Sequence, residues 1–264
     1  MKRFRETMIA NALARRNGGG GGPVAFLPTG SALWLDAADP NGTGLLPANN
    51  STVATWYDKS GSGKSATQST LASRPTFKQN YVNGLGAMYF TTANQMPLPS
   101  LTMGPLTIFV VGKLVTFAPN SFFVALGVGT DIIYIRAIFE PPYFGVDTGI
   151  GPYATTIADT NYHMFSYTQT SVGSFWFDGT TVTTSASISG NAAGNIAYTT
   201  HNTLGGWNGY PNGVDSVLSE VLVYNSAALG TAPRQKIEGY LAWKWGLQSS
   251  LPPGHPYKTA APTA

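Results

Sequence analysis

The stretch LTIFVVGKL, Leu106–Leu114, decides the fold class of this chain. It is long, apolar and rich in β-branched residues, a combination typical of a strand in the middle of a sheet. We therefore expect Leu106–Leu114 to be a central strand, with the other strands arranged around it.

Further strands are indicated on both sides of this run, and turn signals separate them. The dipeptide Asp178-Gly179, for example, is a hairpin turn signal. Because no helix is indicated between the strands, the pattern predicts an all-β fold, a two-sheet antiparallel sandwich. The expected strands are residues 32–35, 53–57, 86–90, 121–126, 131–139, 143–146, 162–168, 173–178 and 216–224.

One helix is indicated near the C-terminus. Thr231 is expected to be its N-cap, Pro233 suits its first turn, and Gly246 is expected to end it. The residues at helical spacing between these points are Ile237, Tyr240, Leu241 and Lys244. The residues that follow, 251–257, are predicted to be an extended, proline-rich tail.

The composition agrees with a β protein of many turns. Charged residues make up 10% of the 264 residues, against about a quarter in a typical globular domain, and Gly, Ser, Thr, Asn and aromatics fill the difference. The length suits a single large sandwich. The chain has no cysteine, which excludes disulfides, thiolate metal sites and cysteine nucleophiles.

The positive charge is concentrated at the N-terminus. The chain carries a net charge of +3, whereas residues 1–16 alone carry five basic residues and one acidic residue. The remainder is therefore nearly neutral, and we expect no nucleic-acid-binding surface there. No apolar run is long enough to span a membrane. The N-terminus does not resemble a signal peptide, because Asn11 breaks its apolar run and Arg15-Arg16 replaces the small residues of a cleavage site.

Four segments are expected along the chain: a basic amphipathic docking peptide (1–17), a Gly-rich linker (18–30), the β domain (31–258) and a tail (259–264). The docking peptide is predicted to form a short anchor helix that is stable only when docked on a partner. A disordered tail and a membrane-surface helix are the alternatives. The residues expected to dock are Phe4, Met8, Ile9 and Leu13, flanked by Arg3, Arg5, Arg15 and Arg16.

The segment WYDKSGSGKSATQ, residues 56–68, has the ending of a nucleotide-binding P-loop. Asp58, however, stands where the motif needs its first glycine, and a carboxylate there would repel phosphates. No amphipathic helix follows the segment. The sequence therefore predicts a glycine-rich turn in which Asp58 bonds its own backbone two residues on, and not an ATPase.

Three pieces together resemble a known family. They are ALWLDA (32–37), the stretch VATWYDKSGSG (53–63) with its continuation ATQ (66–68) and RP (74–75), and SEVLVYN (219–225) followed by IEGYLAWKWGL (237–247) and PPGHPY (252–257). This resembles the laminin-G-like, concanavalin A-like jelly-roll domains of bacteriophage structural proteins and bacterial surface proteins, over about residues 31–258. The resemblance implies a jelly-roll sandwich and a role as sugar reader, adhesion module or decoration. Arg234 departs from the family, where an acidic residue usually completes a capping box with Thr231.

A candidate sugar site lies in the loop of residues 201–213, which combines flat aromatic rings with amides and glycines. The alternative is an ordinary connecting loop with a buried tryptophan. Trp243 and Trp245 offer a second aromatic pair, which we interpret as packing of the helix against the sandwich and not as a sugar platform. The expected sugar-binding residues are Trp207, Asn208, Tyr210 and Asn212.

No metal or cofactor is expected. The resemblance leaves calcium open, with Asp215 and Asp131 as ligands, but no dense calcium-loop spacing supports it. Catalysis is not expected either, because no glutamate has another carboxylate two or four residues away, as paired glycosidase carboxylates would require. The residues considered are Glu6, Glu140, Glu220 and Glu238, together with the isolated His163, His201 and His255.

The sequence therefore predicts a non-enzymatic phage virion surface protein, either a head decoration or fibre or a tail-fibre component. Residues 1–22 would dock on other virion proteins, and the β domain would bind host surface glycans. We expect a homo-oligomer, since several weak contacts on one particle add up. The alternatives are a bacterial carbohydrate-binding or adhesion module and, least favoured, a glycoside hydrolase of the same fold.

Overall fold

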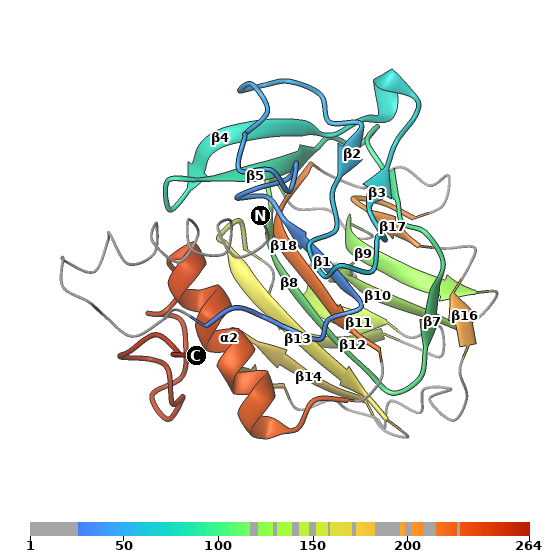
Figure 1. Cartoon of the computed structure of the whole chain (residues 1–264). Coiled ribbons are helices and arrows are strands. Elements are labelled where there is room, and N and C mark those ends of the chain that lie inside the picture. The colour runs from blue at the N-terminus through green and yellow to red at the C-terminus, as the bar shows by residue number, and fades with distance from the viewer. Residues whose placement is uncertain are drawn as a thin grey trace.

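Two antiparallel sheets packed face to face form the body of the chain, and one helix covers the outer face of the larger sheet (Figure 1). The computed structural model describes residues 26–116, 121–128, 131–138, 143–147, 152–157, 159–170, 173–182, 196–198, 202–207, 215–225 and 228–264. Only the backbone is described for residues 102–103, 128, 131–132, 138, 143, 147, 152–157 and 196–198. The predicted all-β, two-sheet jelly-roll class with one C-terminal helix is confirmed. The predicted N-terminal anchor helix lies outside the described residues.

The larger sheet has β8 near its centre, which confirms the prediction made for Leu106–Leu114. The long strand β18 (Ser216–Tyr224) pairs with β8 on one side, and with β5 and then β1 on the other. The order of the sheet is β15 (Thr180–Thr181), β14 (Gly173–Phe177), β13 (His163–Gln169), β8, β18, β5 (Leu85–Phe90) and β4 (Thr76–Val82), with β1 (Leu33–Asp36) beside β18.

The smaller sheet packs against the larger one. Its order is β12 (Pro152–Ile157), β11 (Tyr143–Asp147), β10 (Asp131–Ile138), β9 (Ser121–Val128), β17 (Thr203–Leu204) and β6 (Met96–Pro97). Two short ribbons and a 3₁₀ turn complete the described chain: β16 (Ile196–Tyr198) with β7 (Leu101–Met103), β2 (Thr55–Trp56) with β3 (Ala66–Thr67), and η1 (Leu71–Ser73).

Phenylalanine rings join the two sheets in the core. Phe123 of β9 and Phe144 of β11 each lie 5.1 Å, between ring centroids, from Phe165 of β13. Gly112 of β8 leaves room for this contact, because a Cβ atom on it would lie 3.3 Å from the Phe123 ring and 2.6 Å from the Val217 carbonyl oxygen. The inter-sheet layer is therefore one continuous aromatic and aliphatic core.

A β-bulge in β18 sends one glutamate to the outside of the larger sheet. Leu218 pairs with Gly112 and faces the core, but the register shifts at Ser219, so that Glu220 pairs with Val111. Without the extra residue, Glu220 would face the same side as Leu218, since side chains alternate along a strand. The bulge therefore places the Glu220 carboxylate beneath the helix.

Helix α2 (Thr231–Trp245) begins one residue earlier than expected. Gly230 is its N-cap, and the Gly230 carbonyl accepts the Arg234 N–H, so the prediction of Thr231 as N-cap is wrong. Gly246 ends the helix in the left-handed region, with φ of 78°, as predicted. No described helix is long and apolar enough to cross a membrane.

The loop around Asp58 is a turn, as predicted. The Asp58 carboxylate accepts the N–H of Ser60 at 2.9 Å, of Trp34 at 2.9 Å and of Lys64 at 3.1 Å. Burial alone would raise the pKa of Asp58, but these donors outweigh it and lower the pKa. The Lys64 ammonium donates to the Ser100 carbonyl. The expected strand at residues 53–57 is shorter than predicted, because only Thr55–Trp56 pairs with a neighbour.

The end of the predicted linker lies against the body. The Phe26 ring meets the Tyr240 ring edge-on, with centroids 6.1 Å apart, and the Lys236 ammonium lies 4.7 Å from the Phe26 centroid. Residues 1–25, which hold the expected docking peptide and all eight of its named residues, lie outside the described part of the chain.

Candidate functional site

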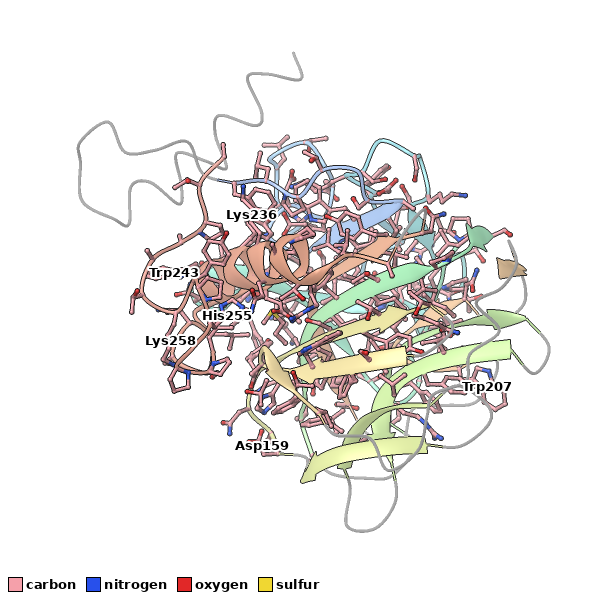
Figure 2. All side chains as sticks on the ribbon, turned by 90° about the horizontal axis from the view of Figure 1, so that it is seen from below. Asp159, Trp207, Lys236, Trp243, His255 and Lys258 are labelled. Carbon is pink, nitrogen blue, oxygen red and sulfur yellow. The ribbon has the colours of Figure 1, made fainter. Side chains whose placement is uncertain are left out.

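Trp207 lies in a small aromatic cluster on the outer face of the smaller sheet. Ile133 and Ile135 of β10 belong to the main core, so Tyr134 between them faces outward. Its ring is 5.8 Å from Trp207 and 5.3 Å from Phe122 of β9, between centroids. In Figure 2, Trp207 is on the side of the sandwich away from Trp243 and His255. Trp207 is partly exposed, so the cluster is accessible to solvent at this residue.

Arg136 adds a cation to this cluster. Its guanidinium carbon lies 5.1 Å from the Phe122 centroid and 5.4 Å from the Tyr134 centroid. A guanidinium held over aromatic rings keeps several N–H donors in a fixed plane. Flat apolar rings beside fixed donors are the combination that sugar sites use. We call Phe122, Tyr134, Arg136 and Trp207 the outer aromatic cluster.

A tight turn after β17 places Trp207 there. Gly205 adopts φ of 69°, and a Cβ atom on it would lie 2.2 Å from the Phe90 ring, so only glycine fits. The Thr203 hydroxyl donates to the Gly206 carbonyl at 2.7 Å and fixes the turn. The chain therefore presents Trp207 on a rigid support.

The other residues expected at this site, Asn208, Tyr210 and Asn212, lie outside the described residues. Sequence reasoning missed Phe122, Tyr134 and Arg136. The sequence pattern that could have revealed them is an aromatic or basic side chain at strand positions that alternate with core positions.

Asp215 and Asp131 are the two residues at which the resemblance leaves calcium binding open, although no metal is expected from the sequence. Asp215 accepts the Tyr89 hydroxyl at 2.7 Å and the Thr92 N–H at 3.1 Å, and the side chain of Asp131 is not described. Among the described residues, no group of three or more His, Cys, Asp or Glu side chains is placed to hold a metal ion.

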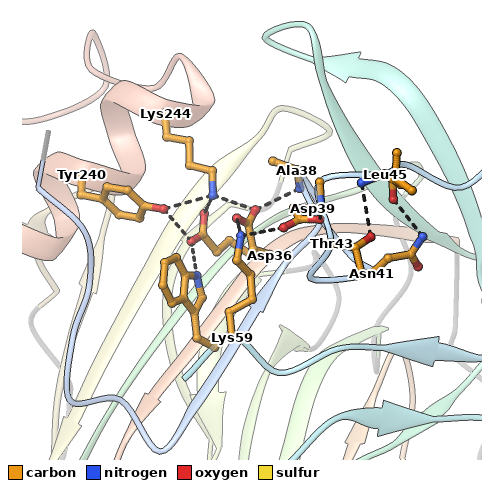
Figure 3. A network of polar contacts seen from close by, with 12 residues as sticks. Asp36, Ala38, Asp39, Asn41, Thr43, Leu45, Lys59, Tyr240 and Lys244 are labelled. Carbon is orange, nitrogen blue, oxygen red and sulfur yellow. Dashed lines mark hydrogen bonds and ion pairs between the residues drawn. The ribbon is translucent and has the colours of Figure 1, made fainter. Parts of the chain in front are cut away.

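The structure contains a carboxylate pair that the sequence did not reveal. Asp36 of β1 and Glu220 of β18 are register partners, and the Lys244 ammonium of α2 lies 2.7 Å from a carboxylate oxygen of each (Figure 3). The indole N–H groups of Trp34 and Trp245 donate to Glu220 at 2.7 and 2.6 Å.

The same network continues to Lys59, whose ammonium lies 3.0 Å from Asp36 (Figure 3). Asp36 and Glu220 are 0% and 1% exposed. Burial raises the pKa of Glu220. Burial opposes ionisation of Asp36 as well, but Lys244 and Lys59 outweigh it and lower the pKa of Asp36 to about 2. The two carboxylates are buried, and the space around them is occupied by the side chains that bind them. The pair therefore connects α2 to the sheet and leaves no room for a substrate.

The tryptophans of α2 pack against protein, as interpreted from the sequence. Trp245 is buried on the Glu220 side, and the Trp243 indole N–H donates to the Tyr257 carbonyl at 2.8 Å. Gly239 of α2 contacts the tail directly, since a Cβ atom there would lie 2.5 Å from that of Tyr257. The helix is therefore held between the larger sheet and the C-terminal tail.

His163 lies between two carboxylates and is not isolated as its sequence position suggested. Its Nδ1 is 2.7 Å from Asp178 and its Nε2 is 2.8 Å from Asp159. Burial would lower the pKa of His163, but the two carboxylates outweigh it and raise the pKa. The Phe177 ring covers the imidazole at 4.3 Å between centroids. The two carboxylates therefore favour the charged imidazolium of His163, which is the first residue of β13.

The fold is an all-β, two-sheet antiparallel sandwich, and solved structures share it. No family model and no curated protein matches the chain. A sialidase of Trypanosoma rangeli is similar at a TM-score of 0.53 and 12% identity, covering 91% of this chain and 38% of that one. The same sialidase in complex with 2,3-difluoro-KDN gives a TM-score of 0.50 at 15% identity, covering 80% and 33%.

The binding domain of Paraclostridial Mosquitocidal Protein 1 is also similar, at a TM-score of 0.53 and 9% identity, covering 73% of this chain and 51% of that one. The chain spans little more than a third of the sialidase structures and half of the mosquitocidal binding domain. At these identities the similarity establishes the fold. The narrower family resemblance, to laminin-G-like phage domains, stays a prediction.

The expectation that the chain is not an enzyme is corrected by this comparison. Among the solved structures that share its fold are those of sialidases, which are enzymes. The absence of a carboxylate pair close in sequence was the reason for that expectation, and it was too narrow, because Asp36 and Glu220 meet across strands. The glycoside hydrolase alternative therefore returns as a hypothesis to test, on the ground of the shared fold and not of this pair, which leaves no room for a substrate.

Proposed function

We propose that the chain is a carbohydrate-binding module whose sugar site is the outer aromatic cluster. The observation that carries this proposal is the position of Phe122, Tyr134 and Arg136 around the partly exposed Trp207, on the outer face of the sheet and apart from the main core. Aromatic faces stack on the C–H face of a sugar ring, and the guanidinium donates to hydroxyls. The fold shared with a sialidase solved in complex with sialic acid supports the same class of ligand.

Binding to a glycan array tests the sugar site. Trp207→Ala is expected to weaken binding of the glycans that the native chain retains by about tenfold or more, since burial of a large apolar side chain contributes roughly 1.5–3 kcal/mol. Tyr57→Ala is the matched control, because Tyr57 is an aromatic residue 48% exposed and outside the cluster. Equal binding by native chain and Trp207→Ala would reject the cluster as the site.

We further propose that the module is part of a phage virion surface, as a head decoration, fibre or tail-fibre component, and that residues 1–22 attach it to other virion proteins. The family resemblance and the basic amphipathic N-terminal peptide followed by glycines support this proposal. Homo-oligomers would raise the avidity of weak glycan contacts.

Cosedimentation with particles from the source tests the attachment. The full-length chain is expected to pellet with the particles, and the chain of residues 23–264 to stay in the supernatant. Circular dichroism of both chains controls for folding. If both chains pellet, the sandwich makes the contact itself, and if neither does, the virion proposal is wrong.

Glycoside hydrolysis is the second candidate function, because the fold is shared with sialidases. Release of free sialic acid from 3′-sialyllactose, followed by chromatography, tests this function. Boiled chain is the negative control. Since Asp36 and Glu220 are sealed, we expect any such activity to survive Glu220→Gln in the fraction that folds. Activity lost in folded Glu220→Gln would instead locate the chemistry at the buried pair.

A further inference from the structure

Three tyrosines and two lysines line the larger sheet beyond the end of α2. Lys78 and Tyr81 belong to β4, Tyr89 to β5, Lys113 to β8, and Tyr162 immediately precedes β13. We call these five residues the tyrosine–lysine strip.

The members share the outer face of the sheet. Tyr89 and Lys113 both pair with Val217 of β18, from opposite sides, so their side chains point the same way. The helix ends beside them, because the amide of Asn83 in the β4–β5 turn donates to the Lys244 carbonyl at 2.8 Å. The strip is therefore the part of this face that α2 leaves uncovered.

A second bulge brings Tyr81 to this face. Residues 78 and 81 would lie on opposite faces of a regular strand, but the register of β4 against β5 shifts between Lys78 and Val82, where Asn80 adopts φ of 49°. The hairpin then closes through Asn83 and Gly84, both at positive φ, which is the two-residue turn that fits the strand twist. The backbone that carries Tyr81 is thus fixed.

The rings and cations contact one another. Tyr81 meets Tyr89 edge-on at 6.5 Å between centroids. The Lys113 ammonium lies 5.9 Å from the Tyr81 centroid and 5.5 Å from that of Tyr162, and the Lys78 ammonium lies 5.1 Å from Tyr89. Tyr81 is 39% exposed, so part of its ring faces solvent.

The two lysines differ from the buried cations in having no acidic partner. Lys59 and Lys244 both pair with Asp36. Within the described part of the chain, by contrast, no carboxylate lies within ion-pair distance of Lys113, and Lys78 donates only to the Asn50 amide oxygen at 2.8 Å. Two ammonium groups on aromatic rings are therefore available to an anion. The nearby Asp215 carboxylate already accepts the Tyr89 hydroxyl and the Thr92 N–H.

We propose that the tyrosine–lysine strip binds an acidic saccharide. The exposed face of Tyr81 receives the C–H face of a sugar ring, and Lys113 and Lys78 bind carboxylates on that ring and its neighbour. A nucleic acid fits less well, because two cations neutralise too few phosphates for useful affinity on a nearly neutral body. The strip and the outer aromatic cluster lie on different sheets, so this proposal does not depend on the site at Trp207.

Affinity electrophoresis of the full chain tests the proposal, in native gels that contain polygalacturonate, alginate or hyaluronate. At least one of these gels is expected to retard the chain. A gel that contains neutral dextran is not expected to retard it. Tyr81→Ala and Lys113→Gln should each weaken retardation by about tenfold, and Lys113→Arg should restore it. Lys236→Gln is the matched control, since Lys236 also lies over an aromatic ring, Phe26, but outside the strip.

The outcomes separate the two saccharide sites. Trp207→Ala should leave retardation by the acidic polymer unchanged, whereas loss of binding in that variant would assign the polymer to the outer aromatic cluster and overturn the proposal. No retardation by any of the three polymers, equal retardation by dextran, or an equal loss in Lys236→Gln would also overturn it. Tighter binding of a (dT)20 oligonucleotide than of the polymers would replace the saccharide with nucleic acid.

Discussion

At the scale of the residue, Lys244 is the cation on which two buried carboxylates depend. It lies 2.7 Å from both Asp36 and Glu220, and both acids are fully enclosed. Lys244→Met should therefore lower the free energy of unfolding in urea by about 3–5 kcal/mol, because it leaves buried charge without its partner. Lys236→Met, on the same helix but partly exposed, should change it by less than about 1 kcal/mol. Similar values for both variants would show that the network does not hold the helix.

His163 makes the stability of the chain depend on pH, and the stability that it contributes falls as the pH rises. Asp178 and Asp159 raise its pKa above the unfolded value of about 6.5, despite the opposing effect of burial. Its ion pairs therefore contribute fully below about pH 6.5, and the contribution is lost as the pH rises through the folded pKa. Urea unfolding should show the native chain losing stability from about pH 6.5 upward, relative to His163→Gln. Parallel pH profiles for the two chains would contradict this.

At the scale of the element, helix α2 is fixed by a glycine that packs against the tail. A Cβ atom on Gly239 would lie 2.5 Å from that of Tyr257. Helix propensity alone favours alanine over glycine by about 1 kcal/mol. The sign of the change in the free energy of unfolding on Gly239→Ala therefore shows whether propensity or packing dominates. We expect Gly239→Ala to destabilise the chain by about 1–3 kcal/mol, since overpacking outweighs propensity. Limited proteolysis should then cut the segment that follows the helix, after Leu247, faster than in the native chain. A stabilised variant would show that this segment moves aside freely.

The elements also show what could be predicted from the sequence. The bounds of β18 were predicted correctly, because its run of apolar and β-branched residues is long. Pairing across strands was not predictable, since Asp36 and Glu220 are far apart in the chain and meet only through register. For the same reason Trp207 could be singled out, but not Tyr134 and Arg136 beside it. The start of α2 was missed by one residue because a glycine carbonyl, and no side chain, begins the helix.

At the scale of the whole molecule, the two sheets should unfold together. Phe165 of the larger sheet contacts Phe123 and Phe144 of the smaller one, so neither sheet keeps a buried face alone. Phe165→Ala should cost about 3–5 kcal/mol. Tryptophan fluorescence and far-ultraviolet circular dichroism should still give coincident urea transitions. Separated transitions in the native chain would show two independent units.

The late position of β18 has a consequence for synthesis of the protein in the cell. The hydrogen bond between Trp34 and Glu220 joins residues 186 positions apart. At roughly 5–20 residues per second, β1 emerges from the ribosome about 10–40 seconds before its partner strand does. Once β8 has been synthesised, it too lacks its neighbour β18 for the rest of that interval and offers an open apolar edge to other nascent chains. Translation speed and chaperone capacity should therefore limit the yield of this protein more than the final stability of its sandwich does.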